Sequence, residues 1–325
     1  MSEHHSYNID PALQPDPGTC AFDLERALAS VVGLQSKVPD NAYTVQALGA
    51  ERAGHAVAIN DSGLVVTIGY LIVEAETVWL FDHTGSAVPG HVTGYDQDTG
   101  FGLVQALGKL NAPGIPIGTT KSVHVGDPVI FAGHGGRTNA LSAVVADKRE
   151  FAGYWEYLLE EALFTEPPHP FWGGGALIDT GGRLVGIGSL FVQKNPGEVG
   201  SFDGNMMVPI DILTPIIDDL QRFGRVQRPP RPWIGALSTE AEDRVVVVNT
   251  WDGGPADQAG LRAGDLVLAV AGHPVASLAQ FYRRLWALGE AGVDVPLDIV
   301  RSGRLAEVTI ESADRAQFYL APKLH

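Results

Sequence analysis

The chain has 325 residues, enough for two or three domains of ordinary size, each with its own core. Hydrophobic residues make up 45% of the sequence and charged residues 18%, as in folded globular proteins. The formal net charge of -16 argues against nucleic acid and anionic membrane surfaces as partners, because both would repel an acidic protein.

Residues 1–20 are polar and rich in proline, and we expect a loose tail there. They lack the segments of a secretory signal, which predicts a cytoplasmic location, or a periplasmic one if a leader has been removed. Glu3, His4 and His5 could hold a metal ion, but no further ligand lies close by, so we expect no metal or other cofactor. The single cysteine, Cys20, cannot form an internal disulfide. No apolar run reaches about 18 residues, so no membrane span is expected.

Residues 21–225 predict many short strands and two helices. Residues 35–210 contain short β-rich runs separated by turn residues, a pattern typical of an all-β barrel or sandwich. An amphipathic helix is expected at 21–34 and a second within 208–225, which would end at Gly224. The apolar faces of these two helices consist of Leu24, Ala27, Leu28 and Val31, and of Ile212, Leu213, Ile216, Ile217 and Leu220.

The proline-rich residues 226–232 predict a linker, after which the pattern changes. Strand-like runs then alternate with a short helix at GPADQAGL and an amphipathic helix at LAQFYRRLWAL, and the segments VPLDIVRSG and LAEVTIE form a hairpin pattern. This second region is therefore expected to be a compact α/β module.

Five segments carry a resemblance to a known family. Residues 251–275, WDGGPADQAGLRAGDLVLAVAGHPV, resemble the PDZ pattern S-P-A-x-x-A-G-L-x-x-G-D-x-I-x-x-x-x-G. With GLVVTIGYLI, DQDTGFGLVQAL, VGDPVIFAGHGG and FWGGGALIDTGGRLVGIGS, they resemble the HtrA family of trypsin-like serine proteases over about residues 23–313. The resemblance implies a mainly β fold, with a chymotrypsin-like double six-stranded β-barrel at 21–225, an α/β PDZ domain at 233–313 and a tail at 314–325.

In that family, three of the barrel segments carry the catalytic histidine, aspartate and serine. Matched one position at a time, these residues fall on Tyr70, Gly100 and Gly173. Acyl transfer by such a triad needs a hydroxyl nucleophile, an imidazole base and a carboxylate that orients the base. Glycine offers no reactive side chain, and a tyrosine phenol stays protonated near neutral pH. The resemblance therefore implies a protease fold without its chemistry.

The loop before Gly173 also departs from the family pattern. The glycine whose amide helps to form the oxyanion hole corresponds to Phe171, followed by Trp172. If the family loop needs a positive φ there, a bulky residue would be strained by about 1 to 3 kcal/mol, so we expect the loop to have relaxed. We also expect Phe171 and Trp172 to fill the substrate cleft, and the glycines after position 173 to be required by close backbone packing.

An active hydrolase with displaced residues is the alternative. It would need a nucleophile and a base within hydrogen-bond reach, and no such pair is evident in the sequence. The glycine run 173–175 lacks the lysine and serine of a phosphate-binding loop. The candidates for displaced chemistry are His83, His91, His134 and His169, with Ser142 and Ser189.

The resemblance implies that the PDZ module keeps a peptide groove. Peptides add as a strand in such domains, and backbone amides of a loop hold the terminal carboxylate. That loop corresponds to Trp233, Ile234, Gly235 and Ala236, and the facing helix offers Leu278, Phe281, Tyr282 and Leu285 as lining residues or as core. Whether the segment QFYLAPKLH blocks the groove stays open.

The favoured interpretation is an inactive HtrA-like pseudoprotease that binds peptides or protein carboxyl termini as a scaffold, a chaperone-like protein or a regulator in protein quality control. The resemblance further implies a homo-oligomer, a trimer formed through residues 21–35. A complex in which this chain regulates an active paralogue is a third possibility. The alternative remains an active serine-type endopeptidase.

Overall fold

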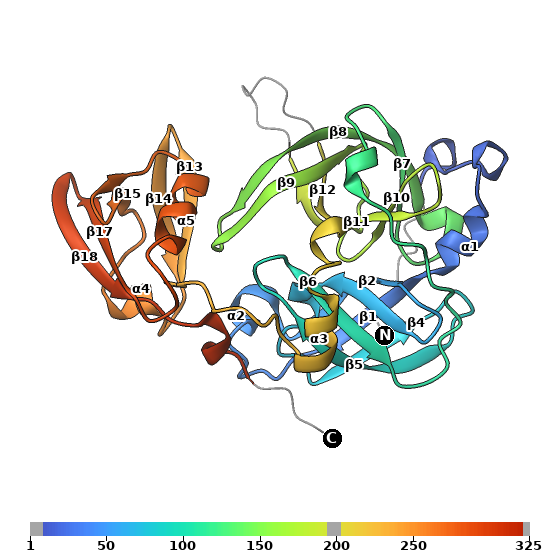
Figure 1. Cartoon of the computed structure of the whole chain (residues 1–325), viewed down its shortest axis with the longest axis horizontal. Helices are drawn as coiled ribbons and strands as arrows, with labels where there is room; N and C mark the ends of the chain where they lie inside the picture. Colours follow the sequence, from blue (N-terminus) through green and yellow to red (C-terminus); the bar gives the residue numbers. More distant parts are fainter. Residues whose placement is uncertain (1–8, 194–202, 321–325) are drawn as a thin grey trace. The chain divides into compact units, whose positions relative to one another are not determined.

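The computed structural model describes residues 9–193 and 203–320, which form two compact units (Figure 1). Of these residues, 9–149, 161–193, 203–226 and 320 form the first unit, and 150–160 and 227–319 form the second. The tip of one hairpin, residues 150–160, thus belongs to the second unit. Glu3, His4 and His5 lie outside the described residues. Within the described ranges, no helix is long and apolar enough to cross a membrane.

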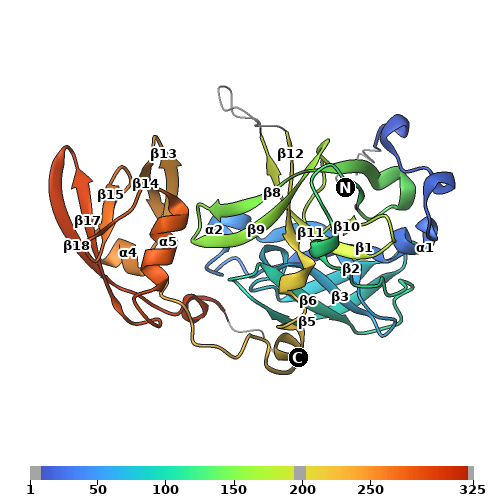
Figure 2. The same ribbon diagram turned by 45° about the horizontal axis from the view of Figure 1, so that its top comes forward.

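Two closed six-stranded barrels make up the first unit, and they confirm the predicted double barrel (Figures 1 and 2). In the first barrel the strands follow the order β1-β2-β3-β6-β5-β4, and in the second β10-β11-β12-β9-β8-β7. The strands of the first are β1 (Val31–Lys37), β2 (Glu51–Ala58), β3 (Leu64–Ile68), β4 (Thr77–Phe81), β5 (Ala87–Tyr95) and β6 (Phe101–Ala106). Those of the second are β7 (Pro128–Ala132), β8 (Ala140–Gly153), β9 (Tyr157–Glu166), β10 (Ala176–Ile178), β11 (Leu184–Val192) and β12 (Gly204–Pro209).

The barrel interiors explain the apolar character of their strands. All five residues of β3 are buried, so its apolar residues do not alternate with exposed ones, and the one polar residue, Thr67, donates its hydroxyl to the carbonyl of His55. In the second barrel, Phe131 is fully buried in a cluster that also holds Leu163, Leu177 and Met207. The partly buried Trp172 packs against this cluster, so the core of the barrel supports the glycine loop.

The helices of the first unit are shorter than predicted. The helix expected at 21–34 ends at Ala29 (α1, Leu24–Ala29), because Val31 and Val32 pair as β1 with β2, as β-branched residues favour. The helix expected within 208–225 is only α3 (Ile217–Phe223), since Pro215 prevents an earlier start, but it does end at Gly224 in the left-handed conformation. One further short helix is α2 (Val45–Leu48).

Residues 9–20 differ from the expected loose tail. They form two 3-10 turns, Pro11–Leu13 and Pro17–Thr19, each opened by an aspartate cap. Ile9 is buried, and its amide donates to the carbonyl of Thr138.

The second unit contains the predicted α/β module. Its sheet has the order β13-β14-β15-β17-β18, with β16 beside β15. The strands are β13 (Ala236–Ala241), β14 (Arg244–Thr250), β15 (Leu266–Val270), β16 (His273–Pro274), β17 (Asp294–Arg301) and β18 (Arg304–Glu311), and the helices are α4 (Pro255–Gln258) and α5 (Leu278–Trp286). Phe281 and Leu285 of α5 are fully buried in its apolar core, together with Val267 and Leu297 of the sheet.

Truncating the largest apolar anchor of α5 should destabilise this module. We expect Phe281→Ala to lower the free energy of unfolding by about 3 to 5 kcal/mol, because it removes buried ring area and leaves a cavity. Leu305→Ala on β18 is the matched control, since Leu305 is 78% exposed. Urea unfolding monitored by tryptophan fluorescence measures both, and equal losses in the two variants would contradict this account of the core.

Candidate functional site

Tyr70 lies in a 3-10 turn (Gly69–Leu71) directly after β3. Its hydroxyl donates a hydrogen bond of 2.9 Å to the carbonyl oxygen of Ser189. Burial raises the pKa of Tyr70 above its ordinary range, because the phenolate would be desolvated. The side chain is therefore a fixed neutral donor and cannot serve as a base near neutral pH.

The structure brings the three positions matched to the family triad together. A Cβ atom added to Gly173 would lie 2.8 Å from the Tyr70 hydroxyl oxygen, too close for both to be present without a shift. Gly100 lies next to Tyr70 through a backbone contact: its carbonyl accepts a hydrogen bond of 2.7 Å from the amide of Gly69, the residue before Tyr70. Gly100 itself has a φ of 82°, a left-handed conformation that glycine adopts readily. The three positions therefore provide neither a carboxylate nor an imidazole, and their one hydroxyl is the phenol of Tyr70.

Close packing fixes the glycine loop after Trp172. Gly174 has a φ of 79°, and a Cβ atom added there would lie 1.9 Å from the backbone oxygen of His55. A Cβ atom at Gly175 would lie 2.6 Å from the Phe131 ring. The expectation that two of the glycines are required by close packing is therefore confirmed for Gly174 and Gly175.

Phe171 does not sit in the left-handed region, so its bulk creates no backbone strain. Its amide donates to Nδ1 of His169 at 3.0 Å, so this N–H is directed at a side chain. The expectation that Phe171 and Trp172 fill the cleft is wrong. A cavity of about 450 Å³ remains beside Gly173, both aromatic residues line it, and Phe171 is 46% exposed.

A histidine cluster lies beside this loop, and sequence reasoning missed one of its members, His55. Nδ1 of His55 accepts from the amide of His134, and burial lowers the pKa of His55 to about 3. His169 is fully buried, and burial lowers its pKa also. Its Nδ1 accepts from Phe171, which leaves Nε2 as the donor to the carbonyl of Asn139 at 3.1 Å. These rings are therefore neutral groups of the fold.

The remaining candidates for displaced chemistry do not form a hydrogen-bonded pair of nucleophile and base. His83, His91 and Ser142 are exposed, whereas Ser189 is buried. In residues 9–193 and 203–320, no hydrogen bond joins a serine or threonine hydroxyl to a histidine ring.

The glycine loop offers a direct test of its packing. We expect Gly174→Ala to lower the free energy of unfolding by more than about 4 kcal/mol or to prevent folding, because its methyl group would collide with backbone. Gly126→Ala is the control, because Gly126 also has a positive φ but nothing within 4 Å of the added Cβ. That variant should lose only about 1 kcal/mol. Comparable thermal unfolding of the two variants would show that the collision is absent.

The low pKa of His55 makes stability depend on pH. The ordinary histidine pKa of 6.5 lies above the folded value of about 3, so the unfolded chain takes up the proton first and stability falls as the pH drops below about 7. Between about pH 7.5 and 5.5 this histidine should account for ~1.4 kcal/mol of lost stability. His55→Asn should show that much less pH dependence in urea unfolding, and the exposed-site control His83→Asn should match the parent. An unaltered slope in His55→Asn would refute the assignment.

The second unit contains a loop built to bind an anion. In Trp233, Ile234, Gly235 and Ala236 the backbone turns through Gly235, whose φ is 74°. Trp233 anchors one end of the loop, because its amide and carbonyl both pair with Ala313. Successive amides of the loop then converge on one point, as in backbone anion sites.

The side-chain carboxylate of Glu156 occupies that point. Its Oε1 accepts from the amides of Gly235 and Ala236 at 2.7 and 3.0 Å, and its Oε2 accepts from the amide of Ile234 at 3.2 Å. Burial raises the pKa of Glu156 to about 7, although the amide hydrogen bonds oppose that shift. Sequence reasoning missed Glu156, because nothing local to the hairpin tip indicates a partner that lies about 80 residues away.

Residues next to Glu156 contact both walls of the groove. The carbonyl of Tyr154 accepts from the amide of Ser238 on β13 at 2.9 Å. The hydroxyl of Tyr282 on α5 donates to the carbonyl of Gly153 at 2.7 Å and accepts from the amide of Glu156 at 3.3 Å. Among the predicted lining residues, Leu278, Phe281, Tyr282 and Leu285 all belong to the apolar core cluster, which also contains Leu158 of the hairpin.

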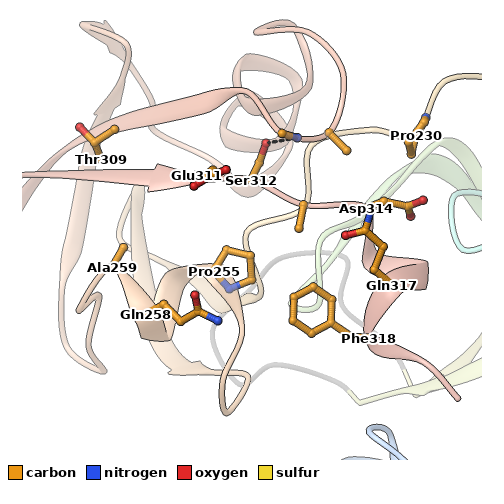
Figure 3. Close-up of a pocket in the computed structure, with 13 residues that line it drawn as sticks. Pro230, Pro255, Gln258, Ala259, Thr309, Glu311, Ser312, Asp314, Gln317 and Phe318 are labelled. Atoms are coloured by element: carbon orange, nitrogen blue, oxygen red, sulfur yellow. Dashed lines mark hydrogen bonds between the residues drawn. The ribbon is translucent and has the colours of Figure 1, made fainter.

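The described part of the C-terminal segment lies elsewhere in the unit. Its 3-10 turn Arg315–Phe318 places the Phe318 ring 5.0 Å from Trp233. Phe318 and Pro255 line a separate, mostly polar cavity of about 620 Å³, seen in Figure 3. The groove is thus occupied by residues 153–156, and the end of the segment QFYLAPKLH, residues 321–325, lies outside the described residues.

Comparisons with known proteins identify both units. Residues 54–187 match the trypsin-like peptidase domain, and residues 232–311 match the PDZ domain. Among solved structures, HtrA-type protease AlgW with a tripeptide superposes with a TM-score of 0.53 at 19% identity, covering 92% of this chain and 97% of that one. The serine endoprotease from Yersinia pestis gives 0.52 at 23%, covering 90% and 98%. The predicted trypsin-like fold with a C-terminal PDZ domain is therefore confirmed.

Similar sequences bear the names of serine endoproteases. The probable periplasmic serine endoprotease DegP-like of Pseudomonas putida is 24% identical over 271 residues, which are 78% of this chain and 54% of the relative. The serine endoprotease DegS of Haemophilus influenzae is 24% identical over 265 residues, 79% of this chain and 76% of the relative. The chain spans about half the length of the DegP-like relatives that it matches.

Proposed function

Since this chain joins a trypsin-like peptidase domain to a PDZ domain and is homologous to the DegP and DegS endoproteases, we propose that it is a catalytically inactive HtrA-like protein that binds peptides. It would hold peptide segments or protein carboxyl termini in its PDZ groove as a scaffold, chaperone-like protein or regulator. The observation that carries the proposal is the packing of the Tyr70 hydroxyl into the space that a side chain at Gly173 would need.

The chemistry of acyl transfer supports this proposal. A serine protease needs a nucleophile, a base and amides that face the oxyanion. Here position 173 has no side chain, the Tyr70 hydroxyl is bonded to Ser189, and the amide of Phe171 is bonded to His169. The Tyr70 hydroxyl and the Phe171 amide are therefore engaged within the protein, whereas Nε2 of His55 has no hydrogen-bond partner among the described residues.

The groove supports the binding half of the proposal. Three amides that converge on one carboxylate provide the contact that a peptide terminus requires, and the amide of Ser238 on β13 can pair with an added strand. Solved structures of AlgW contain a tripeptide and a decapeptide, and we extend peptide binding to this chain by analogy.

An active endopeptidase with displaced residues remains the second candidate, and the cavity lined by His55 is what favours it. His55 is a poor base, because its Nδ1 already accepts from His134 and burial depresses its pKa. The inactive protein is therefore the better account.

We further propose a homo-oligomer, a trimer through residues 21–35 by family analogy, or a complex with an active paralogue. The DegP-like relatives are named as periplasmic, and we propose the same compartment here rather than the cytoplasm.

Catalytic silence is tested by labelling and turnover. With a fluorophosphonate probe and fluorescent casein, we expect no labelled serine and no cleavage above buffer, because in the described part of the chain no serine hydroxyl is hydrogen-bonded to a histidine. Trypsin serves as the positive control for both labelling and casein cleavage. A labelled serine in this chain would end the proposal.

Restoring the residues of the triad tests whether the backbone keeps protease geometry. We expect weak casein cleavage from Tyr70→His, Gly100→Asp and Gly173→Ser combined with Phe171→Gly. Gly173→Ser alone should destabilise the protein, because Tyr70 is in its place. An inactive but folded fourfold variant would show that the loop has departed further from the protease arrangement.

A further inference from the structure

The carboxylate loop of the PDZ domain already holds a carboxylate, and it comes from this chain. We propose that residues 153–156, at the tip of the β8–β9 hairpin, are an internal ligand of the PDZ groove, and that a peptide carboxyl terminus binds this protein only by displacing them. This inference rests on the proposed peptide-binding function and adds the regulation of the same groove.

The first ground is that the carboxylate of Glu156 is hydrogen-bonded by the loop through both of its oxygens. Both of its oxygens accept backbone amides from Ile234, Gly235 and Ala236, and the side chain is buried. Burying an anion is costly unless hydrogen bonds replace its water, so a carboxylate persists here only because the loop satisfies it. Its backbone is also in the left-handed region at a φ of 59°, strain that the surrounding contacts must offset.

The second ground is that the neighbouring residues bind as a peptide does. The carbonyl of Tyr154 accepts from Ser238 on β13, the contact of an added strand. The Tyr282 hydroxyl bridges the backbone of Gly153 and Glu156 from α5. Leu158 joins the apolar cluster of the groove and is only 8% exposed. Carboxylate, strand and apolar contacts therefore come from one short segment.

The rim contacts are weaker than this centre. Arg283 of α5 pairs with Glu150 and Glu160 on either side of the tip, but these side chains are substantially exposed. Exposed ion pairs contribute little, so Glu160→Ala provides a control that removes an acid from the same hairpin and leaves Glu150 on Arg283.

Tethering sets the strength of the competition. A ligand carried on the same chain acts at an effective concentration on the order of millimolar. At micromolar peptide concentration the groove is therefore mostly occupied by the internal ligand. Removing the internal carboxylate should raise the apparent affinity of the protein for the free peptide.

The first measurement is amide hydrogen exchange of the full chain by mass spectrometry. We expect residues 233–238 and 150–158 to exchange about tenfold faster in Glu156→Ala than in the parent, because the amides lose their acceptor and the tip is released. Glu156→Gln keeps the volume and one acceptor oxygen, and should fall between them. Glu160→Ala should match the parent. Unchanged exchange at 233–238 in Glu156→Ala, with the protein still folded by circular dichroism, overturns the inference.

The second measurement uses a fluorescein-labelled peptide that copies residues 149–156 and has a free carboxyl terminus. Its apparent Kd should be about tenfold lower for Glu156→Ala than for the parent and for Glu160→Ala. A version with glutamine last and an amidated end should bind none of them. Equal affinity for parent and Glu156→Ala overturns displacement. Faster exchange without peptide binding to any variant leaves the internal ligand standing and counts against the proposed peptide-binding function.

Discussion

The contact between the Tyr70 hydroxyl and Gly173 is the constraint on which the first unit's site depends. With no side chain at 173, the phenol reaches across the loop to the Ser189 carbonyl, and the loop closes over it through the bond from the His55 amide to the Gly173 carbonyl. Nε2 of His55, which also lines the cavity, has no hydrogen-bond partner in the part of the chain that the structure describes. An open cavity therefore remains beside a position that carries no side chain.

In the second unit, too, a side chain of the protein itself satisfies the polar groups of the site. Its carboxylate loop keeps the geometry of a receptor, and its amides would be unsatisfied donors if the loop were closed to both water and ligand. A side chain from the hairpin satisfies them. In the first unit the Tyr70 hydroxyl thus lies in the space beside Gly173, whereas in the second unit the carboxylate of Glu156 fills the amide loop.

Sequence was sufficient for the architecture because the patterns behind it are local or regularly spaced. The glycine and aspartate positions of residues 251–275 mark the PDZ domain, and short apolar runs mark the barrels. Local reading failed where tertiary pairing decides. Val31 fits a helical face but begins β1, and Pro215 shortens the helix that the apolar stripe suggested.

The site could be predicted only in part for the same reason. Motif order located Tyr70, Gly100 and Gly173, and the structure places them side by side. The cavity beside Phe171 depends on which way a ring turns, which a sequence does not specify. The Glu156 contact spans 79 residues to Gly235, and the tip sequence GYWEY carries no mark of its destination. His55 was missed because its environment is set by His134 and His169, which lie far from it in the sequence.

The fit of Tyr70 against Gly173 also has a historical consequence. A serine introduced at 173 meets the phenol, and a histidine introduced at 70 gives up the bond to Ser189, so either step taken alone leaves a worse-packed protein. Positions 70 and 173 are therefore coupled, because a substitution at one is tolerated only with a substitution at the other. A change to histidine at 70 and serine at 173 would therefore require both substitutions at once.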